Sequence, residues 1–321
     1  MEKGESALIR WFRSHTPRPS QSVKIGLGDD MAMVRADGVR ILVTADMLMD
    51  GVDFDSAACT PRAIGRKALA VSLSDCAAMA VRPRWAILSV ALPNAWSMEY
   101  AQELYHGAQE LAREFQVDIV GGDTNSWDRP LVIDSVVVAE PWPRARPVTR
   151  NGMRPGDLLV VTGSLGGSLA GHHLSFAPRI REARWLAEHL RGSLHAMIDL
   201  SDGLSTDARH LADESGCGIE FDSQSLEALA TVEASTAAKS SGRSVLDHVL
   251  NDGEDYELLF AVRPAAWTRL CDSCEGRRAA GETGGPCFHA IGKAVKQRGV
   301  RLLTPEKAPV EIEPRGWQHF K

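Results

Sequence analysis

The sequence predicts an α+β protein of two domains, and three observations support this fold class. Helical and strand patterns alternate without the regular strand–helix–strand repeat of a parallel α/β fold. The chain has 321 residues, which is long for one hydrophobic core and suits two domains. Pro141, Pro143 and Pro147 are too closely spaced for any regular element. We therefore expect an amino-terminal domain at residues 1–145 and a carboxy-terminal domain at residues 146–321.

Hydrophobic periodicity and turn residues predict the elements of the first domain in order. Pro17 and Pro19 end a short amino-terminal helix, and Asp37-Gly38 is a strong hairpin signal between two strands. Pro61 begins a helix rich in Ala and Leu. The expected elements are a helix at 1–16, strands at 25–34 and 39–44, a helix at 61–79, a strand at 84–92, a helix at 97–114 and strands at 117–120 and 131–139.

The second domain continues the mixed pattern after a turn at Pro155-Gly156-Asp157. Its helices and strands again alternate irregularly, which favours layered sheets and helices. The expected elements are strands at 158–162, 196–200, 218–222, 256–262, 289–294 and 299–303, and helices at 163–172, 178–190, 203–214, 244–250 and from 264 onward.

Composition excludes several classes of protein. The net charge is −6 and no run of Lys and Arg occurs, which argues against a surface for nucleic acid or anionic membrane. No apolar segment is long enough for a signal peptide or a membrane span. Six cysteines in a chain of this size do not form a disulfide framework, so we expect a reduced, cytoplasmic location.

Aspartates carry most of the chemical information. Several occur where a strand or a run of small residues meets a loop, and no Lys or Arg accompanies them. If they converge, cations must relieve their repulsion, and hard oxygen ligands without Cys or His select Mg²⁺ or a similar ion. With glycine-rich turns nearby, the pattern indicates nucleotide phosphate chemistry. The residues are Asp29, Asp30, Asp46, Asp75, Asp123, Asp199 and Asp202.

Taken singly, most of these motifs have an ordinary structural explanation. Asp29 and Asp30 fit a polar turn, and Ser201 or Asp202 fits a helix N-cap. Asp75 is different, because a charge within an apolar helix is costly unless it is paired or bound to metal. It is the coincidence of all the motifs that makes the ordinary explanations improbable together.

Two glycine-rich segments are candidate phosphate-binding turns. Gly121-Gly122 precedes Asp123, and residues 163–168 read Gly-Ser-Leu-Gly-Gly-Ser at the expected start of a helix. The sequence contains no P-loop, no dinucleotide fingerprint, no GxSxG elbow and no HExxH motif, so the common nucleotide and hydrolase motifs are excluded.

A zinc site is a weaker alternative reading of the cysteines. Cys271 and Cys274 have the spacing of half a zinc ribbon, and Cys287 and His289 follow. The second half is irregular, so two cysteines on one helix face explain the pattern as well.

The ordered motifs resemble those of the thiamine-monophosphate kinase family across nearly the whole chain. They are GLGDDMAMV, VTADMLMDGVDF, KALAVSLSDCAAM, VGGDT, RPGDLLVVTGSLGGSLAG, AMIDLSDGL, NDGEDYELLF and the closing RGWQHF. The family shares a superfamily with phosphoribosylformylglycinamidine cyclo-ligase, selenophosphate synthetase and a hydrogenase-maturation protein.

The resemblance implies an ATP-dependent kinase. It would transfer the γ-phosphoryl group of ATP to thiamine monophosphate, with several Mg²⁺ ions and no strong general base, because the acceptor is already an oxyanion. It also implies an amino-terminal α/β domain with a mixed sheet that dimerises and a layered carboxy-terminal α+β domain that completes the nucleotide and acceptor sites. The expected partners are therefore ATP, thiamine monophosphate and a second copy of the chain.

Carried over by motif, the resemblance also implies roles for individual residues. The expected metal ligands and their immediate neighbours are Asp30, Thr44, Ala45, Asp46, Asp75, Asp123, Asp199 and Asp202, of which Asp30, Asp46, Asp75, Asp123 and Asp202 are expected to organise catalysis. Gly122, Asp123, Arg146, Ser201 and Tyr105 are expected to contact the nucleotide. The expected acceptor residues are Asp53, Glu254 and Trp317.

The chain departs from the family pattern at one metal-binding motif, through Ala45, and on the acceptor side. Ala45 replaces a usual Thr, Asp53 a His and Asp252 a Gly, and residues 171–179 are short where the family carries a longer loop. Extra acid there suits the cationic thiazolium ring of thiamine, and it is equally compatible with a changed acceptor. The alternatives are therefore another ATP-dependent enzyme of the superfamily or a nucleotide-binding paralogue without turnover. A metal-dependent phosphatase is disfavoured, because no His lies in the acidic motifs.

Overall fold

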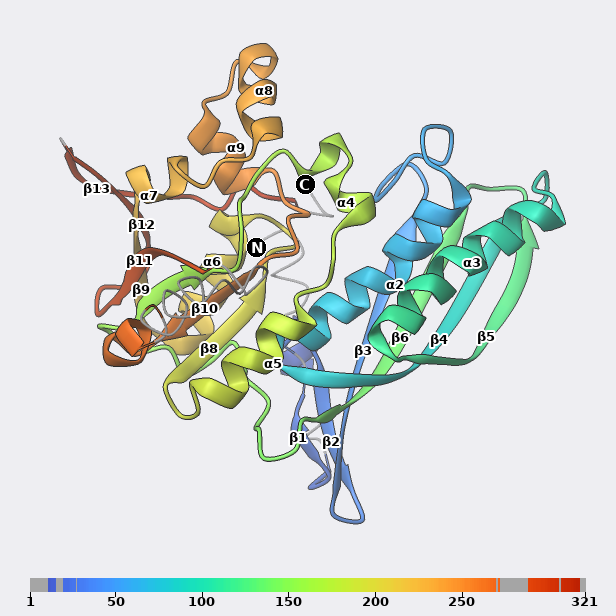
Figure 1. Ribbon diagram of the computed structural model, residues 1–321, viewed down its shortest axis with the longest axis horizontal. Coiled ribbons are helices and arrows are strands. Elements are labelled where there is room, and N and C mark those ends of the chain that lie inside the picture. Colours follow the sequence, from blue (N-terminus) through green and yellow to red (C-terminus); the bar gives the residue numbers. More distant parts are fainter. Residues whose placement is uncertain are drawn as a thin grey trace, which may run out of the picture.

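The protein consists of two sheets with helices, side by side in Figure 1. The computed structural model describes residues 11–15, 20–26, 28–269, 271, 288–305 and 307–317. Of the expected amino-terminal helix, residues 11–15 are described and are helical, and the rest lies outside the described residues. The α+β class with two layered units is confirmed.

The first sheet has six strands in the order β1-β2-β3-β6-β4-β5. Only the β4–β5 pair is parallel, so the sheet is mixed as expected. The strands are β1 Val23–Ile25, β2 Ala32–Ala36, β3 Val39–Met49, β4 Val81–Pro93, β5 Asp118–Trp127 and β6 Val132–Pro141.

Three strand predictions in this sheet were wrong in detail, and each error affects an acidic motif. The expected strand at 25–34 is two strands, because residues 28–31 form a turn that carries Asp30. Strand β3 continues to Met49, so Asp46 lies within a strand and not after it. Strand β5 is a mostly exposed edge strand, not a short buried one, because it pairs on one side only.

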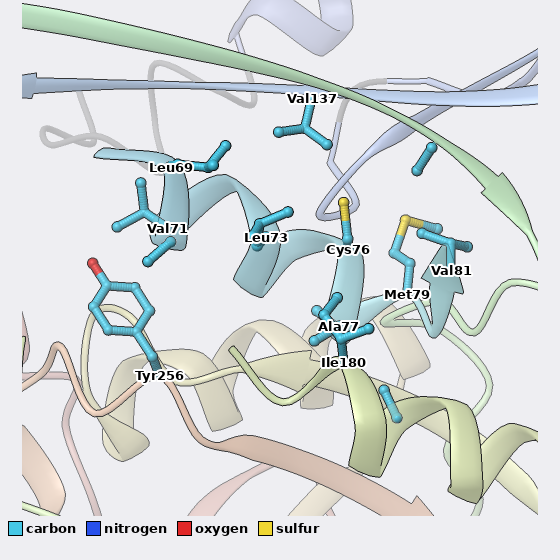
Figure 2. Close-up of a cluster of buried hydrophobic side chains, with 14 of the residues drawn as sticks. Leu69, Val71, Leu73, Cys76, Ala77, Met79, Val81, Val137, Ile180 and Tyr256 are labelled. Carbon is cyan, nitrogen blue, oxygen red and sulfur yellow. The ribbon is translucent and has the colours of Figure 1, made fainter. Parts of the chain in front are cut away.

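Helices α2 (Pro61–Ala78) and α3 (Met98–Phe115) cover one face of this sheet (Figure 1). Thr60 and Ser97 cap their first turns by accepting hydrogen bonds from the N–H groups of Ala63 and Tyr100. Most of α2 is buried, because its other side packs against the second domain. In Figure 2, Leu69 and Leu73 point toward the first sheet, whereas Val71 points toward Tyr256 of the second domain.

The second sheet has seven strands in the order β13-β12-β9-β11-β7-β10-β8, antiparallel except for β12–β9. The strands are β7 Leu158–Val161, β8 Leu194–Asp199, β9 Gly218–Asp222, β10 Leu258–Val262, β11 His289–Val295, β12 Gly299–Thr304 and β13 Lys307–Glu311. The helices are η1 Ser168–Ala170, α4 His172–Ser175, α5 Ile180–His189, α6 Leu204–Ser215, α7 Ser223–Glu227, α8 Val232–Ser241 and α9 Val245–Asn251.

The sequence did not predict α7, α8 or β13, and the expected helix at 163–172 is largely a turn that ends in η1. Helix α8 begins at the Thr231 cap but has a mixed composition of Ala, Ser and Thr, so its apolar periodicity is weak. The segment between β6 and β7 is irregular, and we keep a domain boundary near residue 145 as a proposal.

Successive side chains along the central strands of the second sheet point to opposite faces, and both faces are apolar. Val160, Met197 and Phe260 belong to a core that also contains the buried side chains of α2 and the first sheet. Their neighbours Leu159 and Ile198 belong to a second core with residues of α6 and α9. The first core therefore spans both domains, and it fixes α2 between them.

No helix in the described part of the chain combines the length and the apolar character needed to cross a membrane.

The crossing of α2 and α3 depends on two glycines. A Cβ atom added at Gly107 would lie 1.8 Å from the carbonyl oxygen of Arg62, and one added at Gly65 would lie 1.8 Å from that of Leu104. No side chain fits at either distance, so the two helix backbones are in direct contact here. This contact sets the position of α2 relative to the sheet.

We therefore expect Gly107→Ala to lower the free energy of unfolding by about 1–3 kcal/mol. In an exposed helix the same change would stabilise the protein by about 1 kcal/mol, so the sign is diagnostic. Urea denaturation measures it, with His106→Ala, at an exposed position of the same helix, as the control. A stabilising effect of Gly107→Ala would contradict the close crossing.

Candidate active site

A cavity of about 230 Å³ lies where the two domains meet. Strand β3 and helix α2 contribute its first wall, and the segments after β8 and α9 contribute the second. Among the residues that line it are Asp46, Val52, Asp53, Asp75, Leu169, Asp199, Ser201, Asp202, Asp252, Glu254, Tyr256 and Trp317. Eight of these were expected site residues, so the structure brings the metal and acceptor motifs of both halves to one cavity.

Three carboxylates meet at one end of this site. Asp30 comes from the turn between β1 and β2, Asp75 from α2 and Asp199 from the end of β8. One oxygen of each lies within 4.8 Å of the others, and Asp30 and Asp199 are buried. We call these three residues the carboxylate cluster.

Hydroxyl groups hold the acidic side chains in place. Ser74 donates a hydrogen bond to Asp199 at 2.6 Å, and Ser72 donates one to Asp46 at 2.6 Å. Thr44 donates a short one to Asp75. A hydroxyl donor satisfies one lone pair but does not neutralise the charge. These contacts therefore orient the carboxylates and leave their mutual repulsion in place.

That repulsion appears in the pKa values. Burial raises the pKa of Asp75 well above its usual range, and the charges of Asp46, Asp199 and Asp30 raise it further. Burial and Asp30 raise the pKa of Asp199 to about 7. Burial raises the pKa of Asp46 to about 6, against the hydrogen bond from Ser72. An ionised cluster is thus costly in the absence of a cation.

Arg150 supplies part of the compensation. Its guanidinium donates to both oxygens of Asp30, at 2.7 and 3.2 Å. Burial alone would lower the pKa of Arg150, but the charge of Asp30 and the hydrogen bonds to it raise the pKa overall. One arginine does not balance three ionised carboxylates, so protons or a cation must relieve the repulsion at Asp75 and Asp199.

The donor set of the cluster fits a divalent cation such as Mg²⁺. All of its ligands are carboxylate oxygens, they converge within one ion's reach, and the raised pKa values of Asp75 and Asp199 would fall on binding a positive charge. Asp30, Asp75 and Asp199 would hold such an ion, and Asp46 lines the cavity beside them.

Asp202 is not a helix cap, so that alternative is wrong. The residue before α6 is Gly203, which makes no side-chain capping bond. Asp207, from within α6, instead accepts the N–H groups of Asp202 and Gly203 at 3.2 and 3.0 Å. Ser201 and Asp202 line the cavity, and the N–H of Trp317 donates to the carbonyl of Asp202 at 2.9 Å.

The glycine-rich turn at 163–168 holds carboxylates of the protein itself. The N–H of Gly166 donates to Asp255 at 2.9 Å, and the N–H of Gly167 donates to Asp252 at 2.9 Å. Both N–H groups are therefore already paired within the protein, and the prediction that this turn binds phosphate is wrong for the N–H groups of Gly166 and Gly167. Asp252 is one of the residues that departs from the family pattern, and here it fixes a wall of the cavity.

Seven expected site residues do not line the cavity. Two of them, Asp30 and Thr44, belong to the carboxylate cluster or bond to it, and the other five lie elsewhere. Ala45 lies between Thr44 and Asp46 on β3, so its side chain points to the opposite face of the sheet. Gly122 and Asp123 lie on β5, separated from β3 by β6 and β4, a distance of about 14 Å at the usual strand spacing. Tyr105 is exposed on α3, and Arg146 lies in the irregular segment after β6.

The structure also explains Gly122 without a ligand. A Cβ atom there would lie 1.8 Å from the carbonyl oxygen of Leu88 in β4, whereas one at Gly121 would meet nothing within 4 Å. The glycine thus permits a close approach of two strands.

Sequence reasoning missed Lys67, Ser72, Ser74 and Arg150 as site residues. A lysine within the apolar helix KALAVSLSD is as unusual as Asp75 in the same helix, so the sequence alone could have marked Lys67 as a residue that needs a buried partner. Arg150 had no such signal, because it lies among several arginines in a proline-rich segment. Of the suggested zinc ligands, Cys274 and Cys287 lie outside the described residues.

Comparison with known proteins decides the family. The model of the AIR synthase related protein N-terminal domain matches residues 28–140, and that of the C-terminal domain matches residues 154–304. A thiamine-monophosphate kinase of Rhodopirellula baltica is 39% identical over 98% of this chain and 97% of its own length. The chain belongs to the thiamine-monophosphate kinase family.

Solved structures agree with this family. A structure described as AaThiL complexed with AMPPCP and TMP has a TM-score of 0.82 and 28% identity, covering 100% of this chain and 99% of that one. The hydrogenase maturation protein HypE of E. coli has a TM-score of 0.70 at 19% identity, covering 96% and 97%, and this likeness shows the shared fold alone.

The raised pKa values predict how stability depends on pH. The folded state holds the protons of Asp46, Asp75 and Asp199 more tightly than the unfolded chain, so protonation stabilises the fold. The contribution of Asp199 to the stability of metal-free protein should fall as pH rises from about 4 to about 7. Mg²⁺ displaces these protons, so it should raise Tm more at about pH 8 than at about pH 5.

Thermal denaturation with chelator or with excess Mg²⁺ measures both effects. Asp37→Asn, at an exposed hairpin turn, should keep the full Mg²⁺ shift. Asp75→Asn should lose most of it. Equal Mg²⁺ shifts at the two pH values would rule out the carboxylate cluster as the metal site.

Proposed function

We propose that the protein transfers the γ-phosphoryl group of ATP to thiamine monophosphate and forms thiamine diphosphate. The observation that carries this proposal is the carboxylate cluster at the wall of a cavity whose other residues include the expected acceptor residues Asp53, Glu254 and Trp317. A cation site and an acceptor site must adjoin in an enzyme that joins two anionic phosphates.

The family comparisons support the substrates. The relative of known structure was solved with AMPPCP, an analogue of ATP, and with TMP, and it aligns with the whole of this chain. That structure is 28% identical in sequence to this chain, and the relative from Rhodopirellula baltica, which aligns over 98% of the chain, is a thiamine-monophosphate kinase.

In this proposal the residues of the chain bind and orient, and none acts as a strong base. Bound Mg²⁺ would neutralise the phosphate oxygens and help align the transfer. Asp30, Asp75 and Asp199 hold their positions through Arg150, Thr44 and Ser74. No histidine lines the cavity in the described part of the chain, which suits an acceptor that is already an oxyanion.

The acceptor end of the cavity suits a cation with an aromatic ring. Asp53 and Asp252 add carboxylates there, and Tyr256 and Trp317 add aromatic rings. The ring of Tyr256 is stacked on Phe176 with centroids 4.0 Å apart, which fixes its orientation. We propose that the thiazolium part of thiamine monophosphate lies at this end.

A homodimer in the cytoplasm remains part of the proposal. The face of the first sheet opposite α2 and α3 carries large apolar side chains that are exposed in one chain, including Met47, Trp85 and Ile87. Exposed apolar faces of this extent are typical of interfaces. We propose that a second copy covers this face.

Asp123 shares this face, because strand register places it beside Ser89, Asp134 and Met47. We propose that Asp123 and Gly122 take up their expected metal and nucleotide roles only in the dimer. The roles of Ala45, Tyr105 and Arg146 likewise remain proposals.

One assay tests the proposed reaction. Pure protein with ATP, Mg²⁺ and thiamine monophosphate should form thiamine diphosphate and ADP in equal amounts. Asp75→Asn should reduce turnover by about 10³-fold or more, because it removes one cluster charge. Its Tm without metal should be equal to or above that of the wild type, since repulsion is relieved. Near-normal turnover in Asp75→Asn would refute the metal assignment, and ADP formation only with another acceptor would refute the substrate.

The dimer has its own test. Ile87→Arg places a charge on the open sheet face and should convert the protein to monomers in sedimentation experiments. Val232→Arg, at an exposed position on α8 in the other domain, is the matched control and should leave the assembly unchanged. A dimer that persists in Ile87→Arg would place the interface elsewhere.

A further inference from the structure

Lys67 is the one lysine among the largest fully buried side chains of the described residues. It lies on α2, two turns before Asp75, and its side chain has no exposure to solvent. A buried ammonium group is costly unless it is paired and hydrogen-bonded. Its partners therefore indicate why the position holds a lysine.

Three acceptors surround the Nζ atom of Lys67. The carbonyl oxygen of Asp53 lies at 2.5 Å, and the two carboxylate oxygens of Glu254 lie at 2.7 and 2.9 Å. An ammonium group has three N–H bonds, so these contacts use all of them. Lys67 has no donor left for a phosphate oxygen, and it is not among the residues that line the cavity. A direct role in binding substrate is thereby excluded.

Both partners of Lys67 belong to the acceptor end of the cavity, and they come from different domains. Asp53 lies in the turn after β3, where its own carboxylate accepts the N–H of Met49 at 2.7 Å. Glu254 lies in the segment after α9. Lys67 thus joins two walls of the cavity through a single atom.

The backbone of Glu254 is held in an uncommon conformation. Its φ angle is 54°, and those of Gly253 and Tyr256 are 74° and 50°. Residues other than glycine adopt such angles only where their surroundings enforce them. The N–H of Glu254 donates to the carbonyl oxygen of Ser201 at 2.7 Å, and Lys67 fixes the side chain of Glu254. Lys67 is therefore part of what holds this segment in shape.

We propose that Lys67 is a positioning residue for the acceptor. It fixes the carboxylate of Glu254 and the main chain of Asp53 relative to each other, and so sets the width and charge of the cavity where thiamine monophosphate binds. Because Lys67 pairs with Glu254 and Arg243 pairs with Asp252, the remaining negative charge that faces a cationic ring comes from Asp53. The inference rests on the proposed function, since it concerns the acceptor of that reaction.

Steady-state kinetics of Lys67→Met test the proposal. The variant keeps the length of the side chain and removes the charge, so Glu254 loses its anchor. The KM for thiamine monophosphate should rise about tenfold or more, while the KM for ATP changes by less than about twofold. Calorimetric binding of thiamine monophosphate without ATP should weaken by a similar factor, which separates binding from turnover.

A matched control separates positioning from general destabilisation. Arg179→Met breaks another largely buried ion pair, with Glu257, where Arg179 Nε lies 2.7 Å from the carboxylate. Neither of these two residues lines the cavity. Arg179→Met should lower Tm as Lys67→Met does, but leave the KM for thiamine monophosphate unchanged. If both variants raise this KM equally, Lys67 is only a structural tie and the proposal fails.

A double-mutant cycle keeps the test decisive if Lys67→Met folds poorly. Lys67→Met with Glu254→Gln removes both charges together, which buried pairs tolerate better than the loss of one. If Lys67 acts through Glu254, the double variant should have the same acceptor KM as Glu254→Gln alone. If the two substitutions instead raise the acceptor KM independently, so that the double variant shows the product of the two single effects, the proposal is overturned. A wild-type protein that does not phosphorylate thiamine monophosphate would instead refute the proposed function, and the two failures are thus distinct.

Discussion

The need to satisfy polar groups on one buried helix constrains the whole active site. Helix α2 lies in the core between the two sheets, yet it carries Lys67, Ser72, Ser74 and Asp75. Every one of them requires a partner at that depth. The partners are Glu254, Asp46, Asp199 and Thr44, from three other elements. The hydrogen bonds of a single helix therefore set the positions of both the cation-binding and the acceptor residues.

The sequence sufficed for the fold class and for most of the cavity. Periodicity located the long helices and the buried strands of the second sheet, because each of these has a clear apolar face. The acidic motifs were identified as a group by their anomalous surroundings and by family resemblance, and Asp30, Asp75 and Asp199 do converge. Glu254 and Trp317, far apart in the chain from Asp53, also reach the same cavity.

The features that the sequence did not reveal depend on pairing between distant segments. Strand β5 is at the edge of its sheet, which no local pattern specifies, and so the exposed position of Asp123 was unexpected. The turn at Gly166 and Gly167 has the composition of an anion site, but the anions are Asp255 and Asp252, from the segment after α9 that is distant in sequence. Arg150 became part of the site only because the chain between the domains returns past Asp30.

The hydrophobic core shared by the two domains limits how the molecule can move. Phe260 and Met197 of the second sheet and Leu73 of α2 belong to one continuous apolar cluster. Separating the domains would expose that cluster to water, so a wide rigid-body opening between them carries a large hydrophobic penalty. We therefore expect ligands to enter and leave at the rim, where Leu169 and Trp317 are exposed, and the two halves to melt as one cooperative unit.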